Sequence, residues 1–186
     1  MAKKQQMKRQ LHIGGKQAHP KWEIFDAINA DHVDHVGDAA DLSRFNDGEF
    51  QRIYASHVLE HFAYLKDLIP ALTEWGRVLS PDGIMLISVP DLDVLCRLFL
   101  EKEKLTIGQR YVVTRMMFGG QNNEYDFHYA GLNYELMNYY ARMSGLRIKQ
   151  RVRKFNIFPD YSGHEFAGEV ISLNVVLEKN KNHPSG

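Results

Sequence analysis

Residues 55–62, Ala-Ser-His-Val-Leu-Glu-His-Phe, hold three side chains that could act together on a metal ion or a proton. His57, Glu60 and His61 fit H-x-x-E-H, a pattern found in one class of zinc peptidase. On a helix, two histidines four positions apart lie on one face, and the glutamate between them could be a general base. A third ligand would be required, and Glu135 lies at a suitable distance downstream. The pattern is short, so its surroundings must decide whether it means zinc chemistry.

The surrounding chain is typical of a globular protein of ordinary size. It has 186 residues, 44% of them apolar, and 23 Lys plus Arg balance 23 Asp plus Glu. A neutral chain is a poor candidate for general binding to nucleic acid, so we predict no nucleic-acid partner. Basic residues gather at 1–10 and 147–154. We interpret them as a solvated tail and the polar face of an edge strand, with a local phosphate-binding patch as the alternative.

Compartment and membrane association can also be predicted. No stretch approaches the ~20 apolar residues that a membrane-spanning helix needs, and no signal peptide is visible. Cys96 is the single cysteine, which excludes an internal disulfide, and its apolar neighbours predict a buried thiol. We therefore expect a cytoplasmic protein without a membrane span.

The elements that must position these residues alternate between strands and helices, which is typical of an α/β domain with a mainly parallel sheet. We expect one domain over 1–186, with a flexible basic arm at 1–9 and a flexible tail at 180–186. Asp91 is placed to cap a helix whose apolar face is Val94, Leu95, Leu98 and Phe99. The expected strands are 10–15, running into a glycine turn, 22–26, a strand followed by a turn within 32–42, 50–56, 84–90, 146–154 and 170–179. The expected helices are 64–79, 107–118 and 132–145, with a turn at 81–83 and an irregular loop at 121–131.

Three stretches carry a resemblance to a known family: "LHIGG…HPKWEIFD", "GDAADLSRFNDGEFQRIYASHVLEHF" and "LTEWGRVLSPDGIMLISVPD". Together, over roughly residues 10 to 95, they resemble class I S-adenosylmethionine-dependent methyltransferases, in particular the small bacterial type 11 kind. The resemblance implies a Rossmann-like three-layer sandwich with a seven-stranded, mostly parallel sheet and an antiparallel last strand. It also implies S-adenosyl-L-methionine as cofactor and a small-molecule acceptor, with a sugar or glycan precursor as the suggested class.

The resemblance assigns roles to residues at the strand ends, which converge on one crevice in an open α/β sheet. Gly14 and Gly15 would approach the amino-acid end of the cofactor, and Asp26 would accept hydrogen bonds from the ribose hydroxyls. The adenine and the methyl group involve four further residues: Asp38 and Ala39 for the adenine, Ser56 and His57 beside the methyl group.

A general base is needed only for some acceptors, and several side chains could supply it. The candidates are His57, His128 and Asp91, with His61 one turn further on. Each could equally be a structural contact, and the aromatic stretch 116–135 could be a lid, an acceptor pocket, plain core or a subunit interface. On this interpretation the histidines belong to a strand-to-helix corner, and we expect no metal ligands.

The chain departs from the family pattern near its first glycines. Lys16 stands where a further glycine is usual, and Lys21 where a glycine often precedes the tryptophan. Eleven residues separate Gly14 from Asp26, too few for the usual helix. A second copy or a partner chain could complete this shortened site. Two alternatives to the enzyme therefore stay open: a degenerate methyltransferase fold used for binding or assembly, and a zinc hydrolase using His57, Glu60 and His61.

Overall fold

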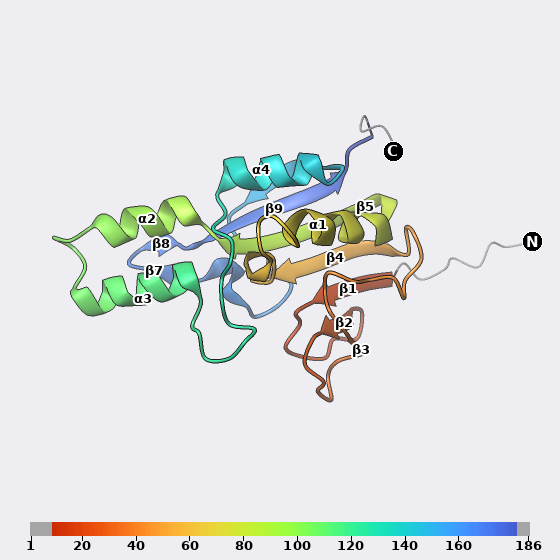
Figure 1. The fold of residues 1–186 in the computed structure, drawn as a ribbon, viewed down its shortest axis with the longest axis horizontal. Coiled ribbons are helices and arrows are strands. Elements are labelled where there is room, and N and C mark those ends of the chain that lie inside the picture. Colours follow the sequence, from red (N-terminus) through yellow and green to blue (C-terminus); the bar gives the residue numbers. More distant parts are fainter. Residues whose placement is uncertain (1–8, 182–186) are drawn as a thin grey trace, which may run out of the picture.

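A seven-stranded sheet forms the centre of the molecule (Figure 1). The computed structural model describes residues 9–181. The strand order is β3-β2-β1-β4-β5-β9-β6, in which β1 to β5 are parallel and β9 runs antiparallel between β5 and β6. The predicted α/β fold, with a seven-stranded, mostly parallel sheet and an antiparallel last strand, is thereby confirmed, whereas the expected third layer of helices is replaced by an irregular segment. The strands are β1 (Arg9–Ile13), β2 (Glu23–Asp26), β3 (His35–Val36), β4 (Phe50–Ser56), β5 (Leu79–Pro90), β6 (Leu146–Val152) and β9 (Ser172–Lys179).

Helices cover one face of this sheet and extend beyond one end of it (Figure 1). α1 (Leu68–Val78) and α4 (Tyr134–Met143) pack on the face, while α2 (Leu92–Leu100) and α3 (Ile107–Phe118) contact each other beyond the carboxyl end of β5. Short elements fill the connections: η1 (Leu59–His61), η2 (Tyr161–Gly163), β7 (Glu165–Phe166) and β8 (Glu169–Val170). No helix joins β1 to β2, β2 to β3 or β3 to β4. Within residues 9–181, no helix has the length and apolar character needed to cross a membrane.

The alternation of side chains along the strands divides the core into two layers. Ile53, Ala55 and Ile87 face α1 and α4 and join the larger cluster. On the opposite face, Tyr54 and Leu86 join a smaller cluster. The rest of that smaller cluster is largely aromatic: Trp22, Ile24, Phe155, Phe158 and Val176. The second face is therefore covered by the irregular segment after β6, which contributes Phe155 and Phe158.

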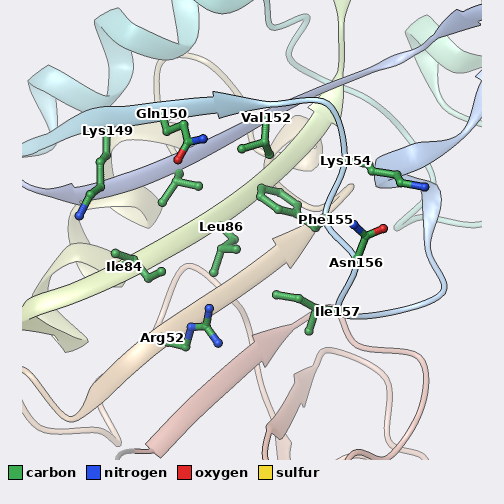
Figure 2. A pocket seen from close by; sticks show the side chains of 11 residues that line it. Arg52, Ile84, Leu86, Lys149, Gln150, Val152, Lys154, Phe155, Asn156 and Ile157 are labelled. Atoms are coloured by element: carbon green, nitrogen blue, oxygen red, sulfur yellow. The ribbon is translucent and has the colours of Figure 1, made fainter.

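A shallow hollow remains on this second face, between the strands and the segment after β6 (Figure 2). Its volume is about 310 Å³. Apolar side chains such as Ile84, Leu86 and Ile157 form its floor, and Arg52, Lys149 and Lys154 add positive charge. This hollow lies on the face away from α1 and α4, since Leu86 belongs to the second cluster.

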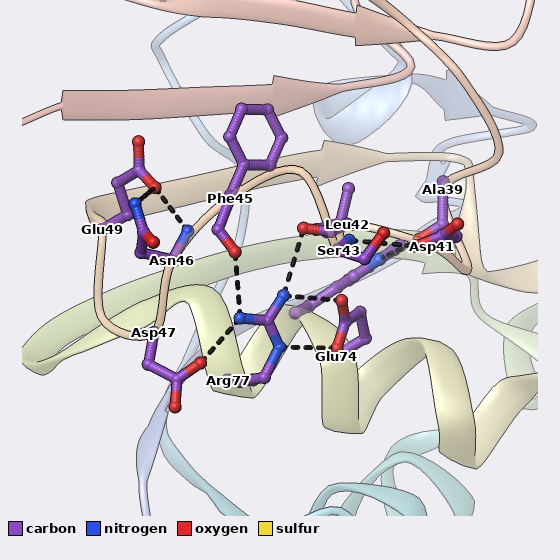
Figure 3. A network of polar contacts seen from close by, with 11 residues as sticks. Ala39, Asp41, Leu42, Ser43, Phe45, Asn46, Asp47, Glu49, Glu74 and Arg77 are labelled. Carbon is purple, nitrogen blue, oxygen red and sulfur yellow. Dashed lines mark hydrogen bonds and ion pairs between the residues drawn. The ribbon is translucent and has the colours of Figure 1, made fainter.

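Arg77 of α1 ties the long connection between β3 and β4 to the helical face (Figure 3). Its Nη1 donates to the backbone oxygen of Phe45 at 3.0 Å and to Oδ1 of Asp47 at 2.7 Å. Its Nη2 donates to the backbone oxygen of Leu42 at 3.1 Å and to Oε1 of Glu74 at 2.7 Å. The guanidinium thus satisfies two carbonyl groups of a segment that has no regular structure of its own.

Several expected boundaries are wrong, each for a local reason. Helix 64–79 begins at Leu68, because Pro70 has no N–H and its ring would clash with a preceding helical turn. Leu65, expected in the apolar stripe, is 98% exposed. The strand expected within 32–42 is only two residues long, and the turn expected after it begins where the side chain of Asp38 accepts a hydrogen bond from the N–H of Ala40.

Other corrections concern β5, α2 and the N-terminal arm. β5 includes the expected turn 81–83, because a register shift against β4 absorbs these residues within the strand. Cys96 is exposed and Phe99 is 36% exposed, since α2 buries only the stripe of Leu95 and Leu98. Arg9, expected in the arm, belongs to β1 and pairs with Glu23 at 2.5 Å. The rest of that arm, 1–8, and the tail at 182–186 lie outside the described residues.

Candidate functional site

The glycine turn after β1 lies directly beneath the corner that follows β4. Gly14 has φ +75°, and its N–H donates to the oxygen of Phe25 at 2.8 Å. A Cβ on Gly14 would lie 2.5 Å from Cγ2 of Val58. A Cβ on Gly15 would lie 2.8 Å from Nδ1 of His12, on the other side of the turn. Both glycines are therefore needed for close packing inside the chain itself.

Asp26 ends β2 as a nearly buried carboxylate, 7% exposed. Its Oδ2 lies 2.7 Å from Nζ of Lys16, and its Oδ1 accepts from the N–H of Ile28 at 2.9 Å. The side chain of Lys16 is 76% exposed. Lys16 can therefore leave this carboxylate by rotating into solvent, whereas Asp26 is fixed by the backbone.

Asp38 and Ala39 follow β3, as expected from the sequence. The Asp38 side chain caps the turn at Ala40, and the carbonyl of Ala39 accepts a hydrogen bond from Nε1 of Trp75 at 2.7 Å. This bond joins the connection after β3 to α1. Asp38 itself is exposed at the surface.

His57 forms the corner between β4 and η1 and is held on both sides of its ring. Its φ of +56° lies in the left-handed region, where residues other than glycine are uncommon. Its N–H donates to the oxygen of Ser88 at 2.8 Å, and its Nε2 lies 3.0 Å from Oγ of Ser172. Its Nδ1 lies 3.2 Å from Oε1 of Glu60. Ser56, one residue earlier, has a buried Oγ with no hydrogen bond to any described residue.

Glu60 is 1% exposed and stands among three histidines. Besides His57, Nε2 of His128 lies 3.9 Å from Oε1 of Glu60, and the rings of His61 and His128 are 4.9 Å apart at 80°. Burial alone would raise the pKa of Glu60, but the three histidines outweigh it and the pKa falls below its ordinary value. Burial lowers the pKa of His128, despite the neighbouring carboxylate. The result is an ionised buried carboxylate surrounded by imidazole rings.

Asp91 caps α2, as predicted, and lies at the carboxyl end of β5. Its Oδ1 accepts from the N–H of Asp93 at 3.2 Å, and its Oδ2 lies 3.0 Å from Nη2 of Arg151. Burial raises the pKa of Asp91 above its ordinary value, although Arg151 acts in the opposite direction. The side chain is 4% exposed, so an acceptor would have to displace Arg151 to reach it.

Comparisons with known proteins agree with this arrangement. Residues 6–87 match the family described as methyltransferase domain. The chain has the class I methyltransferase fold. A comparison with curated proteins gave no match.

Solved structures of methyltransferases share this fold at low sequence identity. An S-adenosylmethionine-dependent methyltransferase from Mesorhizobium loti is 15% identical over 92% of this chain and 90% of its own, with a TM-score of 0.55. The Burkholderia thailandensis 1,6-didemethyltoxoflavin-N1-methyltransferase, solved with bound S-adenosylhomocysteine, is 12% identical over 94% and 72%, with a TM-score of 0.56. A methyltransferase in complex with the Haloferax volcanii Trm112 activator is 12% identical over 93% and 83%, with a TM-score of 0.54. The chain spans only 49% and 51% of two other similar structures.

Within the methyltransferase fold, the predicted residues form separate groups. His57 and His128 both approach Glu60, and Gly14 packs against the residue after His57. Asp91 pairs with Arg151 instead. The remaining predicted residues have other partners: Asp26 pairs with Lys16, Asp38 caps its own turn, and Ala39 bonds to α1.

The arrangement required by the zinc-peptidase hypothesis is not the one found. Residues 59–61 form a single 3-10 turn rather than a helix that presents two histidines on one face. Glu135, the expected third ligand, is an exposed residue of α4, beside Tyr139 and Arg142. Among the described residues, the group whose donor atoms lie close enough to share a metal is Glu60, His61 and His128.

Sequence reasoning missed the central position of Glu60 and the partners Ser172 and Arg151. The available signal was a glutamate directly after two apolar residues, Val58 and Leu59, because a charged residue there must be buried or break the pattern. Ser172 and Arg151 come from strands far along the chain, and no local pattern marks them.

Proposed function

We propose that the protein transfers the methyl group of S-adenosyl-L-methionine to a small-molecule acceptor. One observation carries this proposal: Gly14 and His57 follow β1 and β4, Asp26 ends β2, and these three strands are neighbouring and parallel. Their carboxyl ends therefore share one edge of the sheet, where open α/β sheets bind ligands. The match of residues 6–87 to methyltransferase domains supports the same reaction class.

The polar groups at this edge fit the cofactor. Asp26 is a buried carboxylate at a strand end, suited to accept hydrogen bonds from the ribose hydroxyls, and Lys16 beside it can pair with the carboxylate of the amino-acid end. Gly14 and Gly15 would lie against that end, with Asp38 and Ala39 near the adenine. When bound, S-adenosylmethionine supplies a methyl group already activated by a positively charged sulfur.

The chain's own residues then have to align the acceptor, exclude water and hold a proton where the acceptor requires it. Ser56 and His57 would lie beside the methyl group. Both ring nitrogens of His57 already have partners, Glu60 and Ser172, so His57 could take a proton from an acceptor hydroxyl only by releasing one of them. His128 and Asp91 are the other candidate bases. A sugar or glycan precursor as acceptor, a single domain over 1–186 and a cytoplasmic location stay predictions.

Calorimetry with S-adenosylmethionine and S-adenosylhomocysteine tests the proposal. D26N keeps the shape of the side chain but removes its charge, and it should weaken binding about 10–100-fold, since hydrogen bonds to a charged group contribute ~1.5–3 kcal/mol. D31N, which changes an exposed aspartate nearby, is the matched control and should leave the affinity unchanged. An absence of binding at millimolar cofactor would exclude the enzyme.

A degenerate methyltransferase fold used for binding or assembly is the second candidate. Lys16 already occupies the carboxylate of Asp26, and only a short connection without a helix separates β1 from β2. A partner chain or a second copy would then complete this edge. If K16A bound cofactor and the unchanged chain did not, the Lys16–Asp26 ion pair would prevent cofactor binding in the natural chain. The binding or assembly function would then be favoured. Light scattering after size exclusion tests for a homo-oligomer.

A further inference from the structure

Three side chains converge where the loop 119–131 crosses the corner after β4. Glu60 and His61 belong to η1, and His128 comes from the loop. One donor atom of each lies within 4.8 Å of the donor atoms of the other two. Oε1 of Glu60 and Nε2 of His128 are 3.9 Å apart.

Both histidines are oriented by backbone carbonyl groups. Nδ1 of His61 lies 2.9 Å from the oxygen of Phe127, and Nδ1 of His128 lies 3.1 Å from the oxygen of Met116. A carbonyl oxygen can only accept, so each Nδ1 must carry the proton. In a neutral ring this leaves the lone pair on Nε2. Metal-binding histidines are typically held in this way, by donating the other ring N–H to a carbonyl group.

The carboxylate of Glu60 lacks the partners that a buried charge normally has. It is 1% exposed, and neither of its oxygens accepts a hydrogen bond from a described residue. Nδ1 of His57 lies within ion-pair distance of Oε1, but Oε2 has no such contact among the described residues. Buried charges are usually paired, hydrogen-bonded or bound to a metal. A cation beside Glu60 would therefore complete the group.

We propose that Glu60, His61 and His128 together bind one zinc ion or a chemically similar first-row divalent metal. Two imidazole nitrogens and one carboxylate oxygen are a common zinc ligand set, which leaves a fourth position for water. Zinc bonds of ~2.0–2.1 Å in a tetrahedral set place the donors about 3.3 Å apart. The donor atoms now lie within 4.8 Å of one another, with Glu60 and His128 at 3.9 Å, so the side chains would have to move inward to meet this requirement.

The metal would fasten the loop to the corner of the candidate site. The N–H groups of Tyr129 and Ala130 already donate to the backbone oxygen of Glu60, at 2.8 and 3.0 Å. The side chains of Glu60 and His128 add a second connection between the same two segments. This inference concerns metal binding and loop order, and it does not depend on methyl transfer.

The test uses the full, untagged chain, stripped with a chelator and titrated with zinc chloride against a chromophoric chelator. We expect one zinc per chain in the wild type. H61N and H128N should weaken zinc binding about 100-fold or more, because loss of an outer partner alone costs 10–100-fold. H19N and E135Q are the matched controls, since they change a histidine beside Phe158 on the other face of the sheet and the glutamate of the peptidase hypothesis.

The outcomes separate clearly. Failure of the wild type to bind zinc stoichiometrically would overturn the proposal, as would a larger loss in H19N or E135Q than in H128N. If H128N did not fold, cobalt titration of the wild type would still decide, because tetrahedral cobalt with nitrogen ligands gives intense visible absorption. In the wild type, zinc should also slow amide hydrogen exchange across 119–131, and an unchanged exchange rate would refute the role in fastening the loop.

Discussion

His12 should make the stability of this protein depend on pH in the weakly acidic range. The side chain is 5% exposed and lies on the aromatic face of the sheet, with its ring centre 4.0 Å from that of Phe158 and 4.9 Å from that of Tyr54. Its Nδ1 has no hydrogen-bond partner among the described residues. Burial lowers the pKa of His12 to about 4.

The sign and size of the effect follow from this pKa. In the unfolded chain the pKa of a histidine is about 6.5, so between pH 6.5 and 4 the unfolded state binds the proton and the folded state does not. The contribution of neutral His12 to the free energy of unfolding is therefore present above about pH 6.5, and it is lost as pH falls toward 4. Proton linkage gives a loss of about 2 kcal/mol on going from pH 7.5 to pH 5, and about 3 kcal/mol at the limit.

Urea unfolding at about pH 7.5 and about pH 5 measures this loss. H12F is the informative variant, because phenylalanine has a similar shape, suits the aromatic surroundings and cannot titrate. We expect the wild type to lose about 2 kcal/mol more than H12F between the two pH values. The other charged groups around position 12 are the same in both proteins: Asp160, His19, Lys16 and Asp26. Equal losses in both proteins would refute the reasoning.

Three further substitutions test other contacts by urea or thermal unfolding. R77Q leaves two carbonyl groups of the β3–β4 connection without their donor and should cost about 2 kcal/mol; a loss below 0.5 kcal/mol would contradict this role. G14A should destabilise the protein by more than 2 kcal/mol, because the new Cβ would clash with Val58 at a positive φ. G168A is also at positive φ but has open space around it, so it should cost only about 1 kcal/mol. Equal effects of the two substitutions would exclude the clash with Val58. Y54F removes the hydroxyl that donates to Asp160 and should cost about 1–2 kcal/mol. The loss should be seen mostly as faster amide hydrogen exchange in the segment after β6. Unchanged exchange there would argue that the Tyr54–Asp160 hydrogen bond does not hold this segment.

The elements with strong local signals were predictable from the sequence. β4 and α3 have the expected bounds, and Asp91 caps α2, because apolar alternation, a glycine stop and a capping aspartate each act over a few residues. The seven-stranded, mostly parallel sheet came from the resemblance, and the strand order was not predicted, since single strands do not specify their neighbours. The exposure of Cys96 could not be predicted, because α2 lies past the end of the sheet and its packing against α3 and Ile171 decides which side is covered.

The site was predictable in its strand ends but not in its contacts. The spacing along the chain placed His57 after β4 and Asp26 at the end of β2. It could not show that Lys16 pairs with Asp26, or that His128 reaches Glu60 across a loop. Such contacts depend on how the chain folds back between distant residues, which neither periodicity nor composition records.

The position of β9 also has a consequence for how the chain is made. β6 (Leu146–Val152) pairs in the sheet with β9 (Ser172–Lys179), which is synthesised later and inserts between β5 and β6. While the ribosome is still adding residues 153–171, β6 has no strand to pair with, and the edge of β5 is equally open. The nascent chain therefore exposes two unpaired strand edges that are prone to aggregation until β9 emerges. The order of synthesis makes this half of the sheet the one that most needs protection by a chaperone.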